Sequence, residues 1–274
     1  YFFEMGRKLS TPVCACTNKN SCHSMFSESS PKNGTLLSGD GVSMQAQLLL
    51  FLAFLFFLPS PASAKATALQ RILRKGEITV CARKDIPPFG FVAKKKWQGF
   101  DLELAKQIVK HLARQHKKPI QIKWKAVTAF SRLGELLNGK CDMVAAAFSM
   151  TPNRKKYIAF SEMYLQTKKV VLKRKTIKRK KPVVALVQGT TRQIVLLSGV
   201  VKTFNNYLAL LEGMETNQVD STITDEPIAR FLLKRVGSLF VLSKTLKKRE
   251  RYGVGLRKQD KALLQAVNQA LQGL

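Results

Sequence analysis

The chain has 274 residues, and 47 Lys and Arg against 17 Asp and Glu give it a formal net charge of +30 at pH 7. Its hydrophobic content of 45% is sufficient for a packed core, which excludes a wholly disordered chain. The basic residues are spread in short clusters, without a basic arm, a Cys/His finger pattern or an aromatic-basic RNA-binding motif. We therefore interpret the charge first as a solvated surface, with no nucleic acid expected, and second as a patch for an anionic partner.

The N-terminal 64 residues have the pattern of an export signal behind an upstream extension. Residues 1–43 are polar and show no helical or strand period, so we interpret them as an extension that is disordered or mis-started. Residues 48–58 form an apolar run too short to span a bilayer, and Ala62 and Ala64 follow it at the spacing of a cleavage site. The pattern predicts a signal peptide over 44–64, cleaved near Ala64, and a periplasmic mature protein. An uncleaved interfacial anchor is the alternative.

Cysteine and histidine usage does not indicate a cofactor or a metal. Three of the five cysteines lie upstream of residue 44, and Cys81 and Cys141 remain at predicted strand positions. In an exported protein these two can form one disulfide, and two free buried thiols are an equally good interpretation. The three histidines are scattered, so we expect neither a metal site nor a cofactor.

From residue 69 the chain alternates between helical and strand patterns. A helical apolar pattern begins at residue 69 and ends at Gly76. The strand predicted after Gly76 cannot continue through Pro87 and Pro88, because proline has no backbone N–H for the sheet. The first half is predicted to contain a strand over 78–82, an amphipathic helix over 99–114, a strand over 119–127, a helix over 130–140 and a buried strand over 141–149.

The alternation continues to the C-terminus and repeats itself. The predicted elements are a strand over 168–175, a strand with a Gly-Thr-Thr turn over 181–191, a helix and turn over 205–220, a strand, loop and helix over 221–235, strands over 238–243 and 252–258, and a helix over 260–271. The order of helix, Gly turn, Asp and strand occurs twice, in "LLNGKCDMVAAAFS" and "LLEGMETNQVDSTITD". These βαβ units predict an α/β protein of two lobes with parallel sheets. We expect lobe 1 over 65–174 and 250–274, lobe 2 over 175–249, and joints near 173–176 and 249–253.

Polar side chains follow four of the predicted strands, two in each lobe. Ligands of open α/β sheets bind beyond the carboxyl ends of the strands, so these groups are candidates for one site. An arginine can hold a carboxylate with two hydrogen bonds, a Gly-Thr-Thr turn that opens a helix offers N–H donors, and an aspartate can take an ammonium group. Together they complement a zwitterion. The candidates are Asp85, then Ser149, Thr151 and Arg154, then Gly189, Thr190 and Thr191, and finally Asp225.

Each candidate also has a purely structural interpretation. Arg154 could be a solvated arginine at a helix start, because two lysines follow it. Thr151 could only cap a helix that begins with Pro152, and Asp225 could cap the helix near residue 227. Gly189 could only form a turn. Their joint position at matching strand ends favours a site over these separate explanations.

The residues quoted so far also resemble a known family. The segment "GFDLELAKQIVKHL" at 99–112 is similar to the signature of the bacterial extracellular solute-binding proteins, family 3, which are polar amino-acid receptors of ABC importers. The family's further segments follow in the same order, and they read here "PPFGF", "NGKCDMVAAAFSMTPNRKKYIAFSEMY", "QGTT", "VDSTITDEPIA" and "YGVGLRK". The resemblance covers about residues 69–272.

The resemblance implies a type II periplasmic-binding-protein fold, with two Rossmann-like lobes joined by two hinge strands that close on the ligand. It implies that Arg154 and the Thr191 region hold the ligand α-carboxylate, and that Asp225, Ser149 and the Ala147 carbonyl hold its ammonium group. Asp85 would line the mouth. The implied partners are an amino acid and a membrane permease, with the receptor itself a monomer.

Arg132 lies where acidic amino-acid binders of this family often carry an arginine that meets the ligand side chain. This favours Glu, Asp or Gln as the ligand, and a surface arginine on a helix is an equally good interpretation. The sequence departs from the family at Ile86, where an aromatic residue is common, and at Asn153, where a glutamate is usual.

Two other functions fit part of the sequence. Cyclohexadienyl or arogenate dehydratases resemble these receptors, and Glu162 or Glu226 could then be catalytic. We expect no enzyme, because no pair of carboxylates stands at catalytic spacing. A basic surface protein that binds polyanions is the other alternative, and it rests on the net charge alone.

Overall fold

The computed structural model describes residues 66–191 and 199–274. The predicted extension and signal peptide lie outside the described residues, as does the segment at 192–198 where the helix after the Gly-Thr-Thr turn was expected to begin. No helix in the described part is long and apolar enough to cross a membrane. These described residues belong to one compact unit that begins at Ser63.

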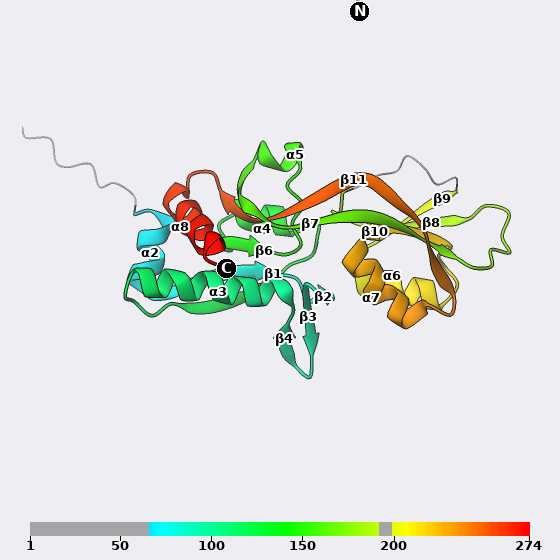
Figure 1. Cartoon of the computed structure of the whole chain (residues 1–274), viewed down its shortest axis with the longest axis horizontal. Coiled ribbons are helices and arrows are strands. Elements are labelled where there is room, and N and C mark those ends of the chain that lie inside the picture. The colour runs from blue at the N-terminus through cyan, green and yellow to red at the C-terminus, as the bar shows by residue number, and fades with distance from the viewer. Residues whose placement is uncertain (1–65, 192–198) are drawn as a thin grey trace, which may run out of the picture. The chain divides into compact units, whose positions relative to one another are not determined.

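One eight-stranded sheet runs through both lobes, in the order β5-β1-β6-β11-β7-β10-β8-β9 (Figure 1). Lobe 1 contributes three parallel strands, which are β5 (Gln121–Ala126), β1 (Glu77–Ala82) and β6 (Met143–Ala145). Lobe 2 contributes another parallel set, which is β10 (Ser221–Asp225), β8 (Val183–Val187) and β9 (Val200–Phe204). Two long antiparallel strands join the sets, namely β7 (Ile158–Arg174) and β11 (Phe240–Arg257). The predicted two-lobed α/β fold is therefore confirmed.

Helices cover the sheet in both lobes. In lobe 1 they are α2 (Ala68–Lys75), α3 (Phe100–Gln115), α4 (Arg132–Leu137), the short α5 (Pro152–Lys155) and α8 (Lys261–Gln272), and in lobe 2 they are α6 (Tyr207–Glu215) and α7 (Glu226–Val236). Successive side chains of β1 point to opposite faces of the sheet, as in any β-strand. Ile78 and Val80 pack in the core with α2, α3 and α8, whereas Cys81 packs on the opposite face beside α4.

Two features of the sheet differ from the predictions. β7 and β11 pair antiparallel with each other, β11 also pairs antiparallel with β6, and β10 pairs antiparallel with β7, so an entirely parallel sheet was wrong. The strands expected over 238–243 and 252–258 are the two ends of β11. The middle of β11 is mostly exposed and charged, so its residues lack the apolar alternation that predicts a strand. The predicted lobe boundaries and joints stay predictions, because β7 and β11 continue from one lobe into the other.

Two further elements had no sequence signal. A three-stranded sheet of β2 (Asp85–Ile86), β3 (Gly90–Ala93) and β4 (Lys96–Gln98) follows β1, and β9 lies at the edge of lobe 2. The tip of this small sheet has Lys94 and Lys95 at φ 49° and 61°, a backbone conformation that Asn and Gly usually adopt.

The repeated aspartate of the two similar motifs has the same structural role in each lobe. Asp142 precedes β6 and accepts a hydrogen bond from the Thr79 backbone N–H at 2.9 Å. Asp220 precedes β10 and accepts one from the Val183 backbone N–H at 2.7 Å. Both aspartates are buried, and each ties the start of its strand to a neighbouring one. The motif is thus part of the scaffold of each lobe.

Cys81 and Cys141 form a disulfide, with their Cα atoms 5.7 Å apart, so the interpretation as free buried thiols was wrong.

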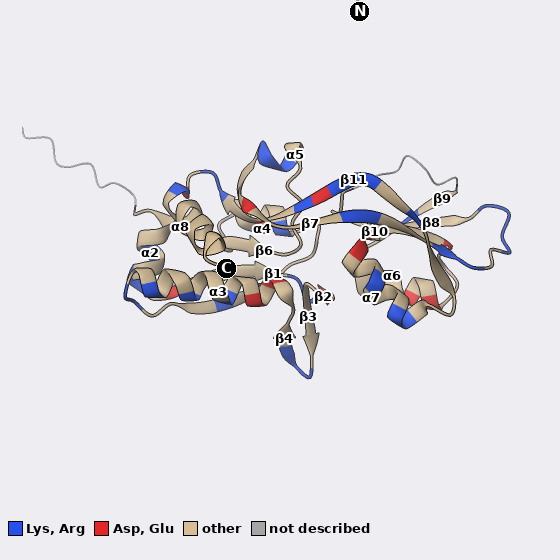
Figure 2. Cartoon of the chain, in the orientation of Figure 1, with Lys and Arg blue, Asp and Glu red and all other residues tan. Residues whose placement is uncertain are grey.

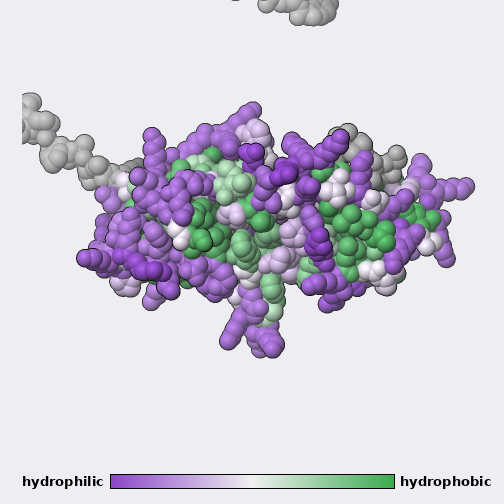
Figure 3. Space-filling view, in the orientation of Figure 1, coloured by the Kyte–Doolittle hydropathy of each residue, from purple (hydrophilic) through white to green (hydrophobic). Residues whose placement is uncertain are grey.

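Lys and Arg lie on helices, strands and loops of both lobes (Figure 2). The face seen in Figure 3 is hydrophilic over most of its area, with hydrophobic residues showing around α6 and α7.

Candidate ligand-binding site

The polar strand ends of both lobes meet around one enclosed cavity of about 10 Å³. Six of the ten predicted site residues line it, together with four residues that were not predicted. The predicted ones are Arg132, Ala147, Ser149, Thr190, Thr191 and Asp225, and the others are Arg83, Ile86, Tyr207 and Ile228. A volume this small holds roughly one water molecule.

Arg154 joins the two lobes. Its guanidinium donates to the Ser149 carbonyl at 2.9 Å and to the Gly189 carbonyl at 2.8 Å. It also lies 4.9 Å from the centre of the Phe148 ring. The group is half-buried, and burial lowers the pKa of Arg154, while Glu250 and Tyr252 raise it. The interpretation as a solvated surface arginine was therefore wrong.

Thr151 and Gly189 lie next to this contact rather than on the enclosed cavity. The Thr151 hydroxyl accepts from the Arg154 backbone N–H at 3.2 Å, so the residue caps α5 as the structural alternative predicted. Thr151, Arg154, Thr190 and Thr191 also line a polar pocket of about 840 Å³ whose other side is formed by residues 247–251 of β11. A direct ligand contact of the Thr151 hydroxyl stays a prediction.

Arg132 lies inside the protein, with 2% of its surface exposed, so the interpretation as a surface arginine was wrong. Its guanidinium donates to the carbonyls of Ala146 and Ala147 and lies 4.4 Å from the Phe148 ring centre. Burial lowers the pKa of Arg132 well below its ordinary value, and Arg154 and Arg83 lower it further. Its buried Nε has no hydrogen-bond partner among the described residues.

Asp225 ends β10 and is paired with a cation of the chain itself. Lys169, which lies opposite Asp225 across the β7–β10 ladder, places Nζ 3.0 Å from Asp225 Oδ1. The exposed fractions are 2% for Lys169 and 7% for Asp225. Asp225 occupies the N-cap position of α7, as the structural alternative predicted, but its side chain makes no capping hydrogen bond to the helix. Lys169 was not predicted from the sequence, although its alternation with exposed Lys168 on a strand could have indicated an inward side chain.

Asp85 forms a buried ion pair with Arg83. Arg83 Nε and Nη2 donate to the two carboxylate oxygens at 2.9 and 2.6 Å. One of these oxygens also accepts from the Tyr207 backbone N–H at 3.1 Å, which links β2 in lobe 1 to the start of α6 in lobe 2. Arg83 has an exposed fraction of 1%. No signal in the sequence separated it from the many exposed basic residues.

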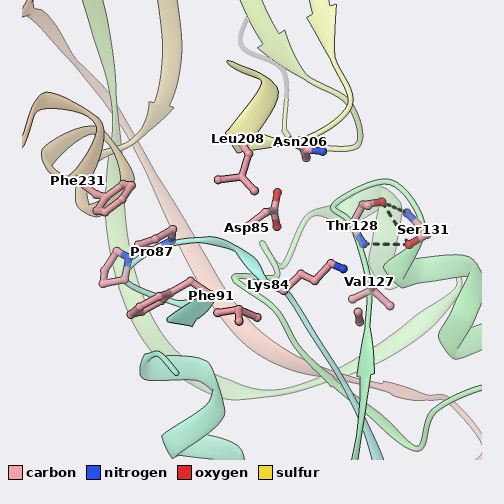
Figure 4. A pocket seen from close by; sticks show the side chains of 13 residues that line it. Lys84, Asp85, Pro87, Phe91, Val127, Thr128, Ser131, Asn206, Leu208 and Phe231 are labelled. Carbon is pink, nitrogen blue, oxygen red and sulfur yellow. Dashed lines mark hydrogen bonds between the residues drawn. The ribbon is translucent and has the colours of Figure 1, made fainter. Parts of the chain in front are cut away.

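Asp85 also lines a wide pocket between the lobes, and its place at the mouth of a ligand site stays a prediction (Figure 4). This pocket has a volume of about 910 Å³. Pro87 and Phe91 of lobe 1 and Leu208 and Phe231 of lobe 2 make its walls largely apolar. Ile86, where the family commonly has an aromatic residue, lines the enclosed cavity instead.

Asp101 fixes the backbone beside the cavity. Its carboxylate accepts from the Ala147 N–H at 2.6 Å and from the Tyr164 hydroxyl at 2.8 Å. Ala147 has a φ of 47°, a left-handed conformation that is unfavourable for alanine, and this hydrogen bond holds it there. Burial raises the pKa of Asp101 to about 6, and its two hydrogen bonds oppose that rise.

The two glutamates considered for a dehydratase lie away from this cavity. Glu162 is exposed and accepts from the Gln272 side chain at 2.8 Å, and Glu226 pairs with Arg230 at 2.6 Å. Neither lines the enclosed cavity. In the described part of the chain no cluster of His, Cys, Asp and Glu could hold a metal ion.

The model of the bacterial extracellular solute-binding proteins, family 3, matches residues 78–274, which is most of the chain. The chain belongs to this family. Among curated relatives, a glutamine-binding protein of Geobacillus stearothermophilus is 28% identical over 213 residues, which is 73% of this chain and 79% of the relative. An L-cystine-binding protein of Escherichia coli (strain K12) is 27% identical over 219 residues, or 74% of this chain and 79% of the relative.

Solved structures agree with the fold. The arginine-bound form of a truncated ArgBP from T. maritima has a TM-score of 0.67 at 27% identity, covering 74% of this chain and 98% of that one. An ancestral amino acid-binding protein, described as a precursor of cyclohexadienyl dehydratase, has a TM-score of 0.65 at 28% identity, covering 76% and 93%. The family is thus one of amino-acid-binding proteins of ABC transporters, and these relatives bind different amino acids.

Proposed function

We propose that this chain is the periplasmic substrate-binding protein of an amino-acid ABC importer and that it binds a polar L-amino acid between its two lobes. The observation that carries the proposal is the meeting of Arg132, Ser149, Thr191 and Asp225, from strand ends in both lobes, around one enclosed cavity. Arg154 lies at its edge and holds a backbone group of each lobe. A ligand that touches both lobes stabilises their closed arrangement.

The ligand replaces contacts that the chain makes with itself. When the lobes separate, Arg154 loses the Gly189 carbonyl and becomes available to the ligand α-carboxylate, which is a stronger partner for a guanidinium than a neutral carbonyl. The Thr190 and Thr191 turn and Ser149 lie on either side of that position. Oδ2 of Asp225, the oxygen that does not pair with Lys169, is the candidate acceptor for the ammonium group. Closure then buries the charged head of the ligand, and the permease recognises the closed form.

A thermal-shift screen of the purified protein tests the proposal. The melting temperature is measured with each of the twenty amino acids, with prephenate and with heparin. We expect one or a few polar amino acids to raise the melting temperature, and the rise to disappear in Arg154→Ala. Arg154→Ala should weaken binding by several kcal/mol, because it leaves the ligand carboxylate unpaired in a closed site. A shift with heparin alone, or turnover of prephenate, would replace the proposal by one of the two alternatives.

A further inference from the structure

The strands β7 and β11 present basic side chains on one face of the ladder that joins the lobes. Arg249 of β11 lies opposite Lys168 of β7, and Arg251 lies opposite Gln166. Partners across an antiparallel ladder point to the same face, and all four of these residues are exposed, whereas the residues that alternate with them are buried. Figure 2 shows the basic residues on both strands where they run between the lobes. We call these four residues the basic ladder.

The positive charges of this region repel one another and lack partners. Lys168 and Arg249 are direct cross-strand partners with the same charge, an arrangement that destabilises a ladder. The register of the ladder shifts just before Arg249, and the extra residues of β11 at this bulge include Lys247 and Lys248, which are exposed. Neither these four cations nor Arg251 form an ion pair within the described part of the chain. A bound anion would remove the repulsion.

The cations line hollows of the surface. The four basic residues of β11 line the polar pocket of about 840 Å³, and Lys168 lines a neighbouring pocket of about 380 Å³, which Arg249 also lines. The carboxylates at these two pockets offer little compensation, because Glu250 has an exposed fraction of 7% and Glu226 is already paired with Arg230. Like charges around a concave surface reinforce one another inside it, so a compact anion is attracted more strongly there than to a flat surface.

We propose that the basic ladder and the two lysines of the bulge form a second binding site, for a soluble anion that carries several phosphate groups. Arg249 and Arg251 each offer paired N–H donors to phosphate oxygens, and Lys168, Lys247 and Lys248 supply further positive charge. Because the cations extend over two adjoining pockets, linked phosphates engage more of them than one phosphate does. The strands that carry the site pair with each other, so the inference is independent of the proposed amino-acid binding.

Calorimetric titration of the unaltered protein with inorganic phosphate, pyrophosphate and triphosphate tests the site. We expect saturable binding of triphosphate, at least tenfold tighter than that of phosphate, and weaker at about 0.15 M than at about 0.01 M salt because salt screens exposed charges. Absence of triphosphate binding at the lower salt concentration would overturn the inference.

The variant Arg154→Ala separates this site from the amino-acid site. Arg154 lines the polar pocket but donates to the Ser149 and Gly189 carbonyls, so we expect the variant to keep triphosphate binding although it loses amino-acid binding. Loss of triphosphate binding in this variant would place the anion at the amino-acid site and overturn the inference. Triphosphate binding without any amino-acid binding by the unaltered protein would contradict the proposed function alone.

The double variant Lys168→Gln/Arg249→Gln, with Lys110→Gln/Arg114→Gln as its matched control, tests the position of the charges. The control pair is also one exposed lysine and one exposed arginine, four residues apart on α3, and it lines neither pocket. We expect the ladder variant to bind triphosphate at least tenfold more weakly and the control to bind it as the unaltered protein does. Equal affinities of the two double variants would show that net charge alone attracts the anion and would overturn the site. If the ladder variant does not fold, Arg251→Gln is compared, and unchanged affinity in it would overturn the site as well.

Vesicles of phosphatidylglycerol test the other source of phosphate groups, a lipid surface. A flat array of headgroups does not enter the two pockets, so we expect the unaltered protein and the ladder variant to co-sediment with vesicles to the same extent. Vesicle binding that depends on Lys168 and Arg249 would replace the soluble anion by a membrane surface and overturn the inference.

Discussion

Gly189→Ala should prevent the lobes from closing without unfolding either of them. Gly189 ends the β8 turn in lobe 2 and lies against the backbone before α4 in lobe 1. A Cβ at this position would be 2.4 Å from both Cα and N of Phe130 and 2.5 Å from the carbonyl carbon of Ala129. Carbon atoms in contact normally stay about 3.5–4.0 Å apart. The two backbone segments would have to move apart by roughly 1 Å, as ordinary contact distances require.

The size of the effect follows from the contacts that such a movement breaks. In the proposed binding mode the movement draws the Thr190–Thr191 turn away from the ligand carboxylate, and the loss of one hydrogen bond to a charged group costs about 1.5–3 kcal/mol. Since each 1.4 kcal/mol is a factor of ten, we expect ligand binding to weaken by roughly 10- to 100-fold. Gly189 also has a φ of 76°, and a side chain in this left-handed conformation costs about 1–2 kcal/mol of folding stability.

Gly139→Ala is the control variant that distinguishes the effect of the steric clash from the effect of the backbone strain. Gly139 has a similar φ of 69°, but no atom lies within 4 Å of the position of its added Cβ. Both variants should lose a similar amount of stability in urea unfolding. Only Gly189→Ala should weaken ligand binding in calorimetry and keep the radius of gyration at its ligand-free value in X-ray scattering. If Gly189→Ala binds and contracts like the unaltered protein, the close approach of Gly189 to Phe130 is no part of the ligand-bound state.

Two further predictions concern stability. Reduction of Cys81–Cys141, which closes a loop with a sequence separation of 60, should lower the free energy of unfolding by about 4 kcal/mol, and a loss below about 1 kcal/mol in urea titration would contradict this. Asp101 has a folded-state pKa raised from 3.8 to about 6, so the folded protein binds its proton more tightly than the unfolded chain does. Its contribution to stability is therefore fully present below pH 4 and is lost, by about 3 kcal/mol, as the pH rises to about 6. The difference in unfolding free energy between the unaltered protein and Asp101→Asn should change by that amount between pH 4 and pH 7, and an equal difference at both pH values would refute it.

Local patterns were sufficient to predict most helices and the parallel strands other than β9. Ile78 and Val80 alternate with outward residues, and the apolar face of α3 recurs at helical spacing, so these elements are visible in short windows. β11 was split in the prediction because its charged middle section pairs with β7 through backbone groups, which leave no apolar pattern. Pairing between residues that are 66 to 99 positions apart, from Arg174 with Phe240 to Ile158 with Arg257, is a tertiary property that short windows do not contain.

The same limit applies to the site. Ser149, Thr191 and Asp225 were predicted because each follows a recognisable strand, and the structure brings them to one cavity. Arg83 and Lys169 were missed, because in a chain with 47 Lys and Arg the residue type does not distinguish a buried cation from an exposed one, and only the strand alternation with Lys168 could have indicated Lys169. Their burial depends on carboxylates that lie on other strands, such as Asp225 opposite Lys169.

Calorimetric titration with polar amino acids, performed in parallel on the unaltered protein and on Arg154→Ala, tests the central claim most directly. The account predicts saturable one-site binding of at least one polar amino acid to the unaltered protein and a loss of several kcal/mol in the variant. Equal binding by both proteins would show that the ligand head does not dock at the joint between the lobes. Absence of binding by the unaltered protein to any amino acid would contradict the receptor function itself.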